Sequence, residues 1–128
     1  MEEISKFLET LEQIRAKDRR YALEAYSFVM ATLHGLLDRL GEARHVSGAE
    51  LSHQVRDYAI DQFGPLARSV LEQWGLRTTA DIGEIVFNMV EAGLLRKTPE
   101  DRKEDFANVY DFVQAFEQNY PYLQHPPL

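Results

Sequence analysis

The chain has 128 residues, contains no cysteine and carries a formal net charge of −7 at pH 7. A chain of this length buries roughly two-thirds of its unfolded surface, enough for one domain with a hydrophobic core. The lack of cysteine excludes disulfides and zinc–cysteine sites, and the acidic charge disfavours nucleic acid and anionic membranes as partners. No apolar run approaches the roughly 18 residues that span a membrane, and the charged N-terminus lacks a signal-peptide core.

Two helices are predicted in the first third of the chain. Residues 3–16 place apolar side chains on one face and charged ones opposite, which indicates a helix packed on the domain edge; a partner-helix or dimer contact is the alternative. Residues 21–40 are apolar nearly all round the axis, which predicts the central buried helix. Asp18 is a candidate cap for this second helix, and we expect a neighbouring helix to approach closely at Gly35.

The strongest local signal is a helix start at residue 48. Ser47 and Glu50 form a full capping box, and Val46 with Leu51 form the accompanying hydrophobic staple. The box predicts a third helix that begins at Gly48 and continues to the Gly-Pro pair at residues 64–65.

Residues 65–93 predict a helix-turn-helix. Pro65 can open a short helix that Gly75 ends, and Thr78 with Asp81 can open a second helix that Gly93 ends. After each of these two glycines, a leucine is placed to pack back on the helix, as in a Schellman motif. The short glycine-containing connection fits a helix-turn-helix, and a plain helical hairpin in an all-α core is the alternative.

The segment after this pair predicts a winged-helix hairpin. Residues 94–98 can form a strand, residues 99–104 a charged loop and residues 105–110 a returning strand. Asp111 can cap a further short helix that runs to Gln118. We therefore expect a mainly α fold of five to six helices, with a helix-turn-helix and a short winged-helix-like β-hairpin. It forms one domain over residues 1–120, followed by an extended, proline-rich tail at 121–128.

A DNA-binding use of this scaffold would depend on basic residues beside the last predicted helix of the pair. A recognition helix normally presents basic and amide side chains to the bases and phosphates. This helix instead carries Asp81, Glu84 and Glu91, which would oppose binding. The candidate nucleic-acid contacts lie around it: Arg77, Arg96, Lys97, Arg102 and Lys103.

No motif indicates a metal, a cofactor or a catalytic nucleophile. The four histidines lack metal-ligand spacing, because no two are three or four residues apart. One candidate pocket is formed by His45, Glu50 and His53, and would serve an enzyme. Acidic pairs such as Asp81 with Glu84 are expected to be solvated surface in a chain with 21 acidic residues.

Several phrases of the sequence together match a known pattern. They are Asp18-x-Arg20-Tyr21, Glu24-Ala25-Tyr26-x-Phe28-Val29, Arg44-His45-Val46-Ser47-Gly48-x-Glu50-Leu51, Tyr58-Ala59-x-Asp61-Gln62-Phe63-Gly64-Pro65, Trp74-Gly75, Asp81-Ile82-Gly83-Glu84-Ile85-Val86-Phe87-Asn88 and Tyr110-Asp111-Phe112. The chain resembles a family of small uncharacterised proteins largely restricted to planctomycetes and verrucomicrobia, over about residues 8–117. The resemblance implies a bacterial cytoplasmic protein. It brings no activity and no functional residues.

The sequence favours a non-enzymatic protein-interaction or regulatory module on a winged-helix-like scaffold, with a protein as its partner. A winged-helix DNA-binding protein is the alternative, and an enzyme using the His45 pocket is a third. We expect no cofactor and no membrane association, and the chain could form an oligomer.

Overall fold

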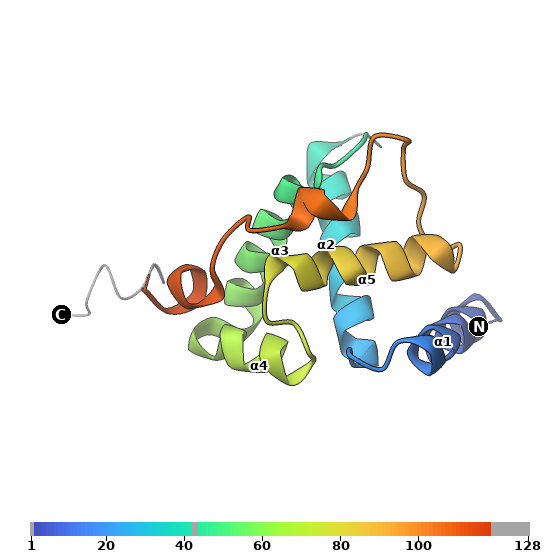
Figure 1. Ribbon diagram of the computed structural model, residues 1–128, viewed down its shortest axis with the longest axis horizontal. Coiled ribbons are helices and arrows are strands. Elements are labelled where there is room, and N and C mark those ends of the chain that lie inside the picture. Colours follow the sequence, from blue (N-terminus) through green and yellow to red (C-terminus); the bar gives the residue numbers. More distant parts are fainter. Residues whose placement is uncertain (1, 42–43, 119–128) are drawn as a thin grey trace.

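Five α-helices and no β-strand are formed by residues 2–41 and 44–118, the part of the chain that the computed structural model describes (Figure 1). The fold also contains three short helical turns. Two are 3-10 turns, η1 (Gly64–Leu66) and η2 (Lys103–Phe106), and one is a π-helical turn, η3 (Gln114–Gln118). The mainly α prediction is confirmed. The helices are α1 (Glu2–Lys17), α2 (Leu23–Leu40), α3 (Gly48–Phe63), α4 (Ala67–Gln73) and α5 (Thr79–Glu91).

The predicted capping box opens α3. The Ser47 hydroxyl accepts a hydrogen bond of 3.1 Å from the backbone N–H of Glu50, and the Glu50 carboxylate accepts one of 3.1 Å from the backbone N–H of Ser47. Two N–H groups that have no partner within the helix are thereby satisfied. This fixes the first residue of α3 at Gly48, as predicted.

Both helices of the predicted helix-turn-helix end in Schellman motifs. After α4, the N–H of Leu76 donates to the carbonyl of Leu71 (2.9 Å), and Gly75 has a φ of +99°. After α5, the N–H of Leu94 donates to the carbonyl of Met89 (2.8 Å), across a glycine with a φ of +83°. The left-handed conformation is one that glycine adopts without a Cβ penalty, so these two stops follow from local sequence.

The start of α2 differs from the prediction that Asp18 caps it. Ala22 occupies the N-cap position without a side-chain hydrogen bond, and its N–H donates to the carbonyl of Trp74 at 3.0 Å. A Cβ on Gly75 would collide with the carbonyl oxygen of Arg20, so glycine permits this close approach. The α1–α2 connection is thus packed on the α4–α5 turn, and Asp18 is engaged elsewhere.

The predicted winged-helix hairpin is wrong. Over residues 94–110 the chain forms turns and η2 instead of strands, and η2 packs on α3 and α5 (Figure 1). Phe106 is buried against Gly83 of α5, where an added Cβ would lie 2.9 Å from the Phe106 side chain. Burial of this aromatic ring against a glycine, together with weak strand formers over 105–108, favours the docked turn over an exposed hairpin.

The first half of α2 is buried in the core, whereas none of residues 33–40 is buried, so the prediction of a central buried helix is confirmed only in part. This helix contacts α1, α3 and α5, and its Ala25, Tyr26 and Val29 are fully buried. A cluster of rings joins α2, α3 and the end of α4, with centroids 4.9–5.7 Å apart: Phe28, Tyr58, Phe63 and Trp74. The expected close approach at Gly35 is wrong, because a Cβ there would meet nothing within 4 Å.

The apolar face of α1 is only partly buried. Leu11 and Ile14 are buried, whereas Ile4 and Leu8 are 62% and 47% exposed.

The predicted cap near the end of the described chain is formed. The Asp111 carboxylate accepts from the backbone N–H of Gln114 (3.0 Å), as predicted for a helix start. The predicted tail at 121–128 lies outside the described residues.

Candidate functional site

An apolar groove lies where the end of α2, the start of α3, the end of α5 and residues 95–106 meet. We call it the basic-rimmed groove. Its cavity has a volume of about 210 Å³. It is positioned by the Schellman turn after α5, which redirects the chain across the end of α2. The apolar side chains that line it include Leu33, Leu37, Val86, Phe87, Val90 and Leu95.

Four arginine and lysine side chains rim this groove against two aspartates, in a chain whose net charge is −7. Both aspartates are used to hold the surrounding loop. Asp101 accepts from the backbone N–H of Thr98 (2.8 Å) and lies 3.2 Å from His45 Nε2, and Asp105 accepts from the backbone N–H of Arg102 (3.0 Å). Arg44 is paired with Glu50, so the rim has a small positive excess, from Arg96, Lys97 and Arg102 against the two aspartates.

The five predicted basic contacts are not one continuous surface. Arg96, Lys97 and Arg102 lie together at the basic-rimmed groove. Lys103 instead lies 3.2 Å from the Glu84 carboxylate, on the side of α5. Arg77 precedes α5 at its opposite end, and about 10 Å of helix separates the start of α5 from Val86, the first residue of α5 that lines the groove.

The three side chains of the predicted His45–Glu50–His53 pocket contact three different partners. His45 pairs with Asp101 at the groove. Glu50 pairs with Arg44 at 2.7 Å, and this guanidinium together with the Ser47 backbone N–H lowers the pKa of Glu50 to about 2. The His53 ring lies 5.7 Å from the Tyr110 ring centroid. A carboxylate with so low a pKa is a weak proton acceptor near neutral pH.

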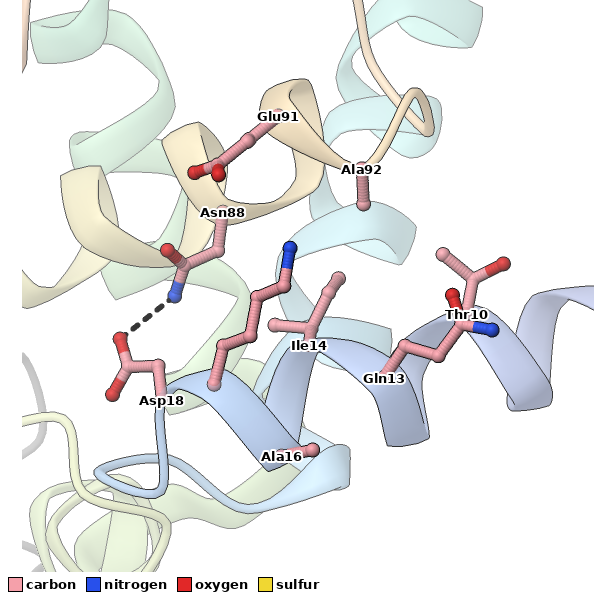
Figure 2. Close-up of a pocket in the computed structure, with 9 residues that line it drawn as sticks. Thr10, Gln13, Ile14, Ala16, Asp18, Asn88, Glu91 and Ala92 are labelled. Carbon is pink, nitrogen blue, oxygen red and sulfur yellow. Dashed lines mark hydrogen bonds between the residues drawn. The ribbon is translucent and has the colours of Figure 1, made fainter.

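A second cavity, of about 420 Å³, opens between α1 and α5 (Figure 2). Thr10 and Gln13 face it from α1, and Glu91 faces it from the end of α5. At one side, the Asn88 amide donates to the Asp18 carboxylate at 2.9 Å. The Asp18 and Asn88 side chains in the wall of this α1–α5 pocket are bonded to each other.

These two residues belong to a polar network that ties the α1–α2 connection to α5. Arg20 donates to both oxygens of Asp18 at 2.9 and 2.7 Å, and to the Glu84 carboxylate at 3.0 Å. The Arg20 guanidinium holds the pKa of Asp18 well below its usual range. Asn88 also donates to the Tyr26 hydroxyl at 3.0 Å. The network fixes α5 against α2 and its preceding loop.

The Asp81 carboxylate accepts from the Thr78 backbone N–H at 3.1 Å, so the predicted capping box of α5 is confirmed. Asp18 does not cap α2 as predicted, and Asp81 and Glu84 are partly buried instead of solvated surface. Tyr21 donates to Asp81 at 2.6 Å, and burial with this bond raises the pKa of the Tyr21 phenol. The partners are 60 to 70 residues apart in sequence for the Tyr21, Arg20 and Asp18 contacts with α5. The periodicity of the sequence does not predict such pairs, although these residues all occur in the sequence segments that carry the family resemblance.

The network and η2 leave α5 with little free surface. Of its 13 residues, Ala80 and Glu91 alone are exposed, and all others are buried or partly buried. Figure 1 shows α5 crossing the middle of the fold, with η2 on one side. The position of α5 in the fold is that of a core helix.

Within the described ranges, no cluster of three His, Asp or Glu side chains could hold a metal ion. None of the helices formed by these residues has the length and apolar character needed to cross a bilayer. Comparison with protein-family models, with curated proteins and with solved structures finds no match to this chain.

Proposed function

We propose that this protein is a non-enzymatic protein-interaction or regulatory module, and that the basic-rimmed groove is its contact surface. The observation that carries the proposal is an apolar floor whose rim has more basic than acidic side chains, in a chain that is acidic as a whole. Interfaces are organised in this way, with an apolar centre surrounded by polar residues. The module acts in a bacterial cytoplasm, as the family resemblance implies.

DNA binding is the second candidate, and the arrangement of α5 weighs against it. A recognition helix must present several side chains to the major groove, yet Ala80 and Glu91 are the exposed residues of α5. The basic residues are distributed over both ends and one side of this helix, so they do not follow one phosphate backbone. What favours DNA is the grouping of Arg96, Lys97 and Arg102.

An enzyme using His45, Glu50 and His53 is the third candidate. Each of these side chains is engaged with a different partner, namely Asp101, Arg44 and the Tyr110 ring. A catalytic role would require a base and a nucleophile within hydrogen-bond reach of one substrate atom. The contacts observed support structural roles at the start of α3.

The test compares peptide and DNA binding by the same protein. We expect a random peptide display library to yield binders. We expect duplex DNA to bind with a Kd above roughly 10⁻⁵ M at physiological salt, which is within the ordinary non-specific range or weaker. DNA affinity is measured by fluorescence anisotropy on mixed-sequence duplexes at two salt concentrations. Submicromolar, sequence-dependent DNA binding that Arg96→Ala weakens would replace the protein-interaction proposal with the DNA-binding one.

A further inference from the structure

The size of the basic-rimmed groove indicates the kind of occupant it takes. Pockets for free small molecules occupy about 300–1,000 Å³ and enclose most of the ligand. This cavity has a volume of about 210 Å³. It is better matched to one large apolar side chain that belongs to a longer ligand. Anchor side chains that fill such pockets supply much of the affinity of a protein interface.

The apolar surface continues beyond the cavity along α2. Leu33 and Leu37 line the groove, and Leu40 lies one turn further on the same side of the helix. The Leu40 side chain is 39% exposed, although large apolar residues are mostly buried in this fold. An occupant that covers Leu40 as well as the cavity must extend past a single side chain, as a peptide segment does.

The charge on the rim selects the chemistry of that segment. Arg96 and Lys97 are exposed, and neither side chain makes an ion pair with any other residue in 2–41 or 44–118. The Asp101 and Asp105 carboxylates beside them are bonded to the backbone of their own loop. The two cations are therefore available to a partner's carboxylates, while the net charge of −7 repels acidic chains elsewhere on the surface.

We propose that the basic-rimmed groove binds an acidic segment of a partner protein. One apolar side chain of the segment fills the cavity, and flanking aspartate or glutamate side chains pair with Arg96 and Lys97. This inference rests on the proposed function and specifies the partner that the module recognises. Carboxylate contacts of this kind steer association and set the orientation of the segment more than they add affinity.

The experiment uses two matched peptide display libraries and one unbiased library, each selected on the whole protein. Both matched libraries fix a central leucine, phenylalanine or tryptophan; one flanks it with Asp and Glu, the other with Asn and Gln. We expect binders to come predominantly from the acidic library. A fluorescein-labelled selected peptide then serves as the probe, together with its variant in which the central apolar residue is alanine.

Charge reversal at the rim separates the groove from the rest of the surface. Arg96→Glu combined with Lys97→Glu should weaken binding of the probe about tenfold or more, equivalent to at least about 1.4 kcal/mol. Arg77→Glu makes the same kind of change at an exposed residue before α5, and should alter the Kd less than about twofold. All three positions are exposed, and a thermal melt of each variant checks that the fold is retained. Added salt should weaken the wild-type complex.

The outcomes distinguish the two proposals. Enrichment of acidic peptides, with binding lost on rim reversal and on alanine substitution of the central residue, supports both. Peptides that bind equally from the amide library, or are insensitive to rim reversal, leave a protein-interaction module but overturn the acidic-segment inference. If none of the three libraries yields a binder, both the protein-interaction proposal and the acidic-segment inference are wrong. Rim-dependent binding of duplex DNA without peptide binding reassigns the groove to nucleic acid.

Discussion

The hydroxyl of Thr79, in the first turn of α5, donates a 2.6 Å hydrogen bond to the carbonyl oxygen of Phe106. The same hydroxyl accepts a bond of 3.1 Å from the backbone N–H of Val109. Thr79 is 1% exposed, so both backbone groups depend on it in a place with little access to water. This one side chain therefore holds the chain from η2 onward against α5, where a hairpin was expected.

Replacement of Thr79 by valine should destabilise the protein by about 1–3 kcal/mol. The side-chain shape is nearly retained, but one buried carbonyl and one N–H lose their partner, and unsatisfied buried groups carry a penalty of this size. The measurement is the urea midpoint at constant slope. An unchanged midpoint would show that the Thr79 bond does not hold this segment.

Thr98→Val is the matched control for that substitution. The Thr98 hydroxyl oxygen is buried and has no hydrogen-bond partner among the residues that the structure describes. Its removal deletes an unsatisfied polar group, so stability should be unchanged or slightly increased. A loss comparable to that of Thr79→Val would indicate that the threonine-to-valine change itself is costly in this fold.

Glycine 83 should be intolerant of a methyl group. Gly83→Ala places a Cβ 2.9 Å from the Cβ and ring of Phe106, and such overpacking should cost about 1–3 kcal/mol despite the better helix propensity of alanine. Gly35→Ala is the matched helix substitution, because its Cβ meets nothing within 4 Å. It should stabilise by up to about 1 kcal/mol. Thermal melts that move both variants in the same direction would contradict the docking of η2 on α5.

The Ser47 cap should contribute measurably to stability. Ser47→Ala removes the acceptor of the Glu50 backbone N–H and should cost about 1 kcal/mol. Urea denaturation of wild type and variant tests this value. Ser27→Ala is an exposed control within α2, where serine does not cap a helix, and should change stability by less than about 0.5 kcal/mol. Equal urea midpoints for Ser47→Ala and wild type would show that the cap does not contribute to stability.

The Glu50 carboxylate should contribute stability in a defined pH range. Its pKa in the folded protein is about 2, below the ordinary value of 4.5, because Arg44 and the Ser47 N–H favour the charged form. The stabilisation is therefore full above about pH 4.5 and is lost as the pH falls towards 2. Glu50→Gln should cost roughly 0.5–1 kcal/mol at pH 7, the range for an exposed ion pair.

That cost should vanish when both proteins are compared at the lowest accessible pH. The test is urea denaturation at pH 7, 4 and 2.5, with Glu104→Gln as control, since Glu104 is an exposed acid in η2. A Glu50→Gln penalty that is independent of pH would assign the effect to packing. A penalty equal to that of Glu104→Gln at every pH would assign it to net charge.

The sequence by itself determined where most helices begin and end. The Ser47–Glu50 box and the Gly75 and Gly93 stops are short-range devices, in which the bonded groups lie within about five residues. The period of apolar residues likewise predicted the helix that α2 forms, although α5 is the more completely buried helix. Such features depend on local backbone geometry, so they can be predicted from the sequence without knowledge of the fold.

The site was determined only by tertiary packing. Residues 94–110 had the composition of a loop with weak strands, and the burial of Phe106 on Gly83 made them a docked turn. Asp18 had the position of a cap, but its carboxylate accepts hydrogen bonds from Arg20 and Asn88 and so belongs to the network with α5. The groove brings together α2, α3, α5 and the loop after α5. Contacts between residues dozens of positions apart are decided by competing packing energies, which local sequence patterns do not contain.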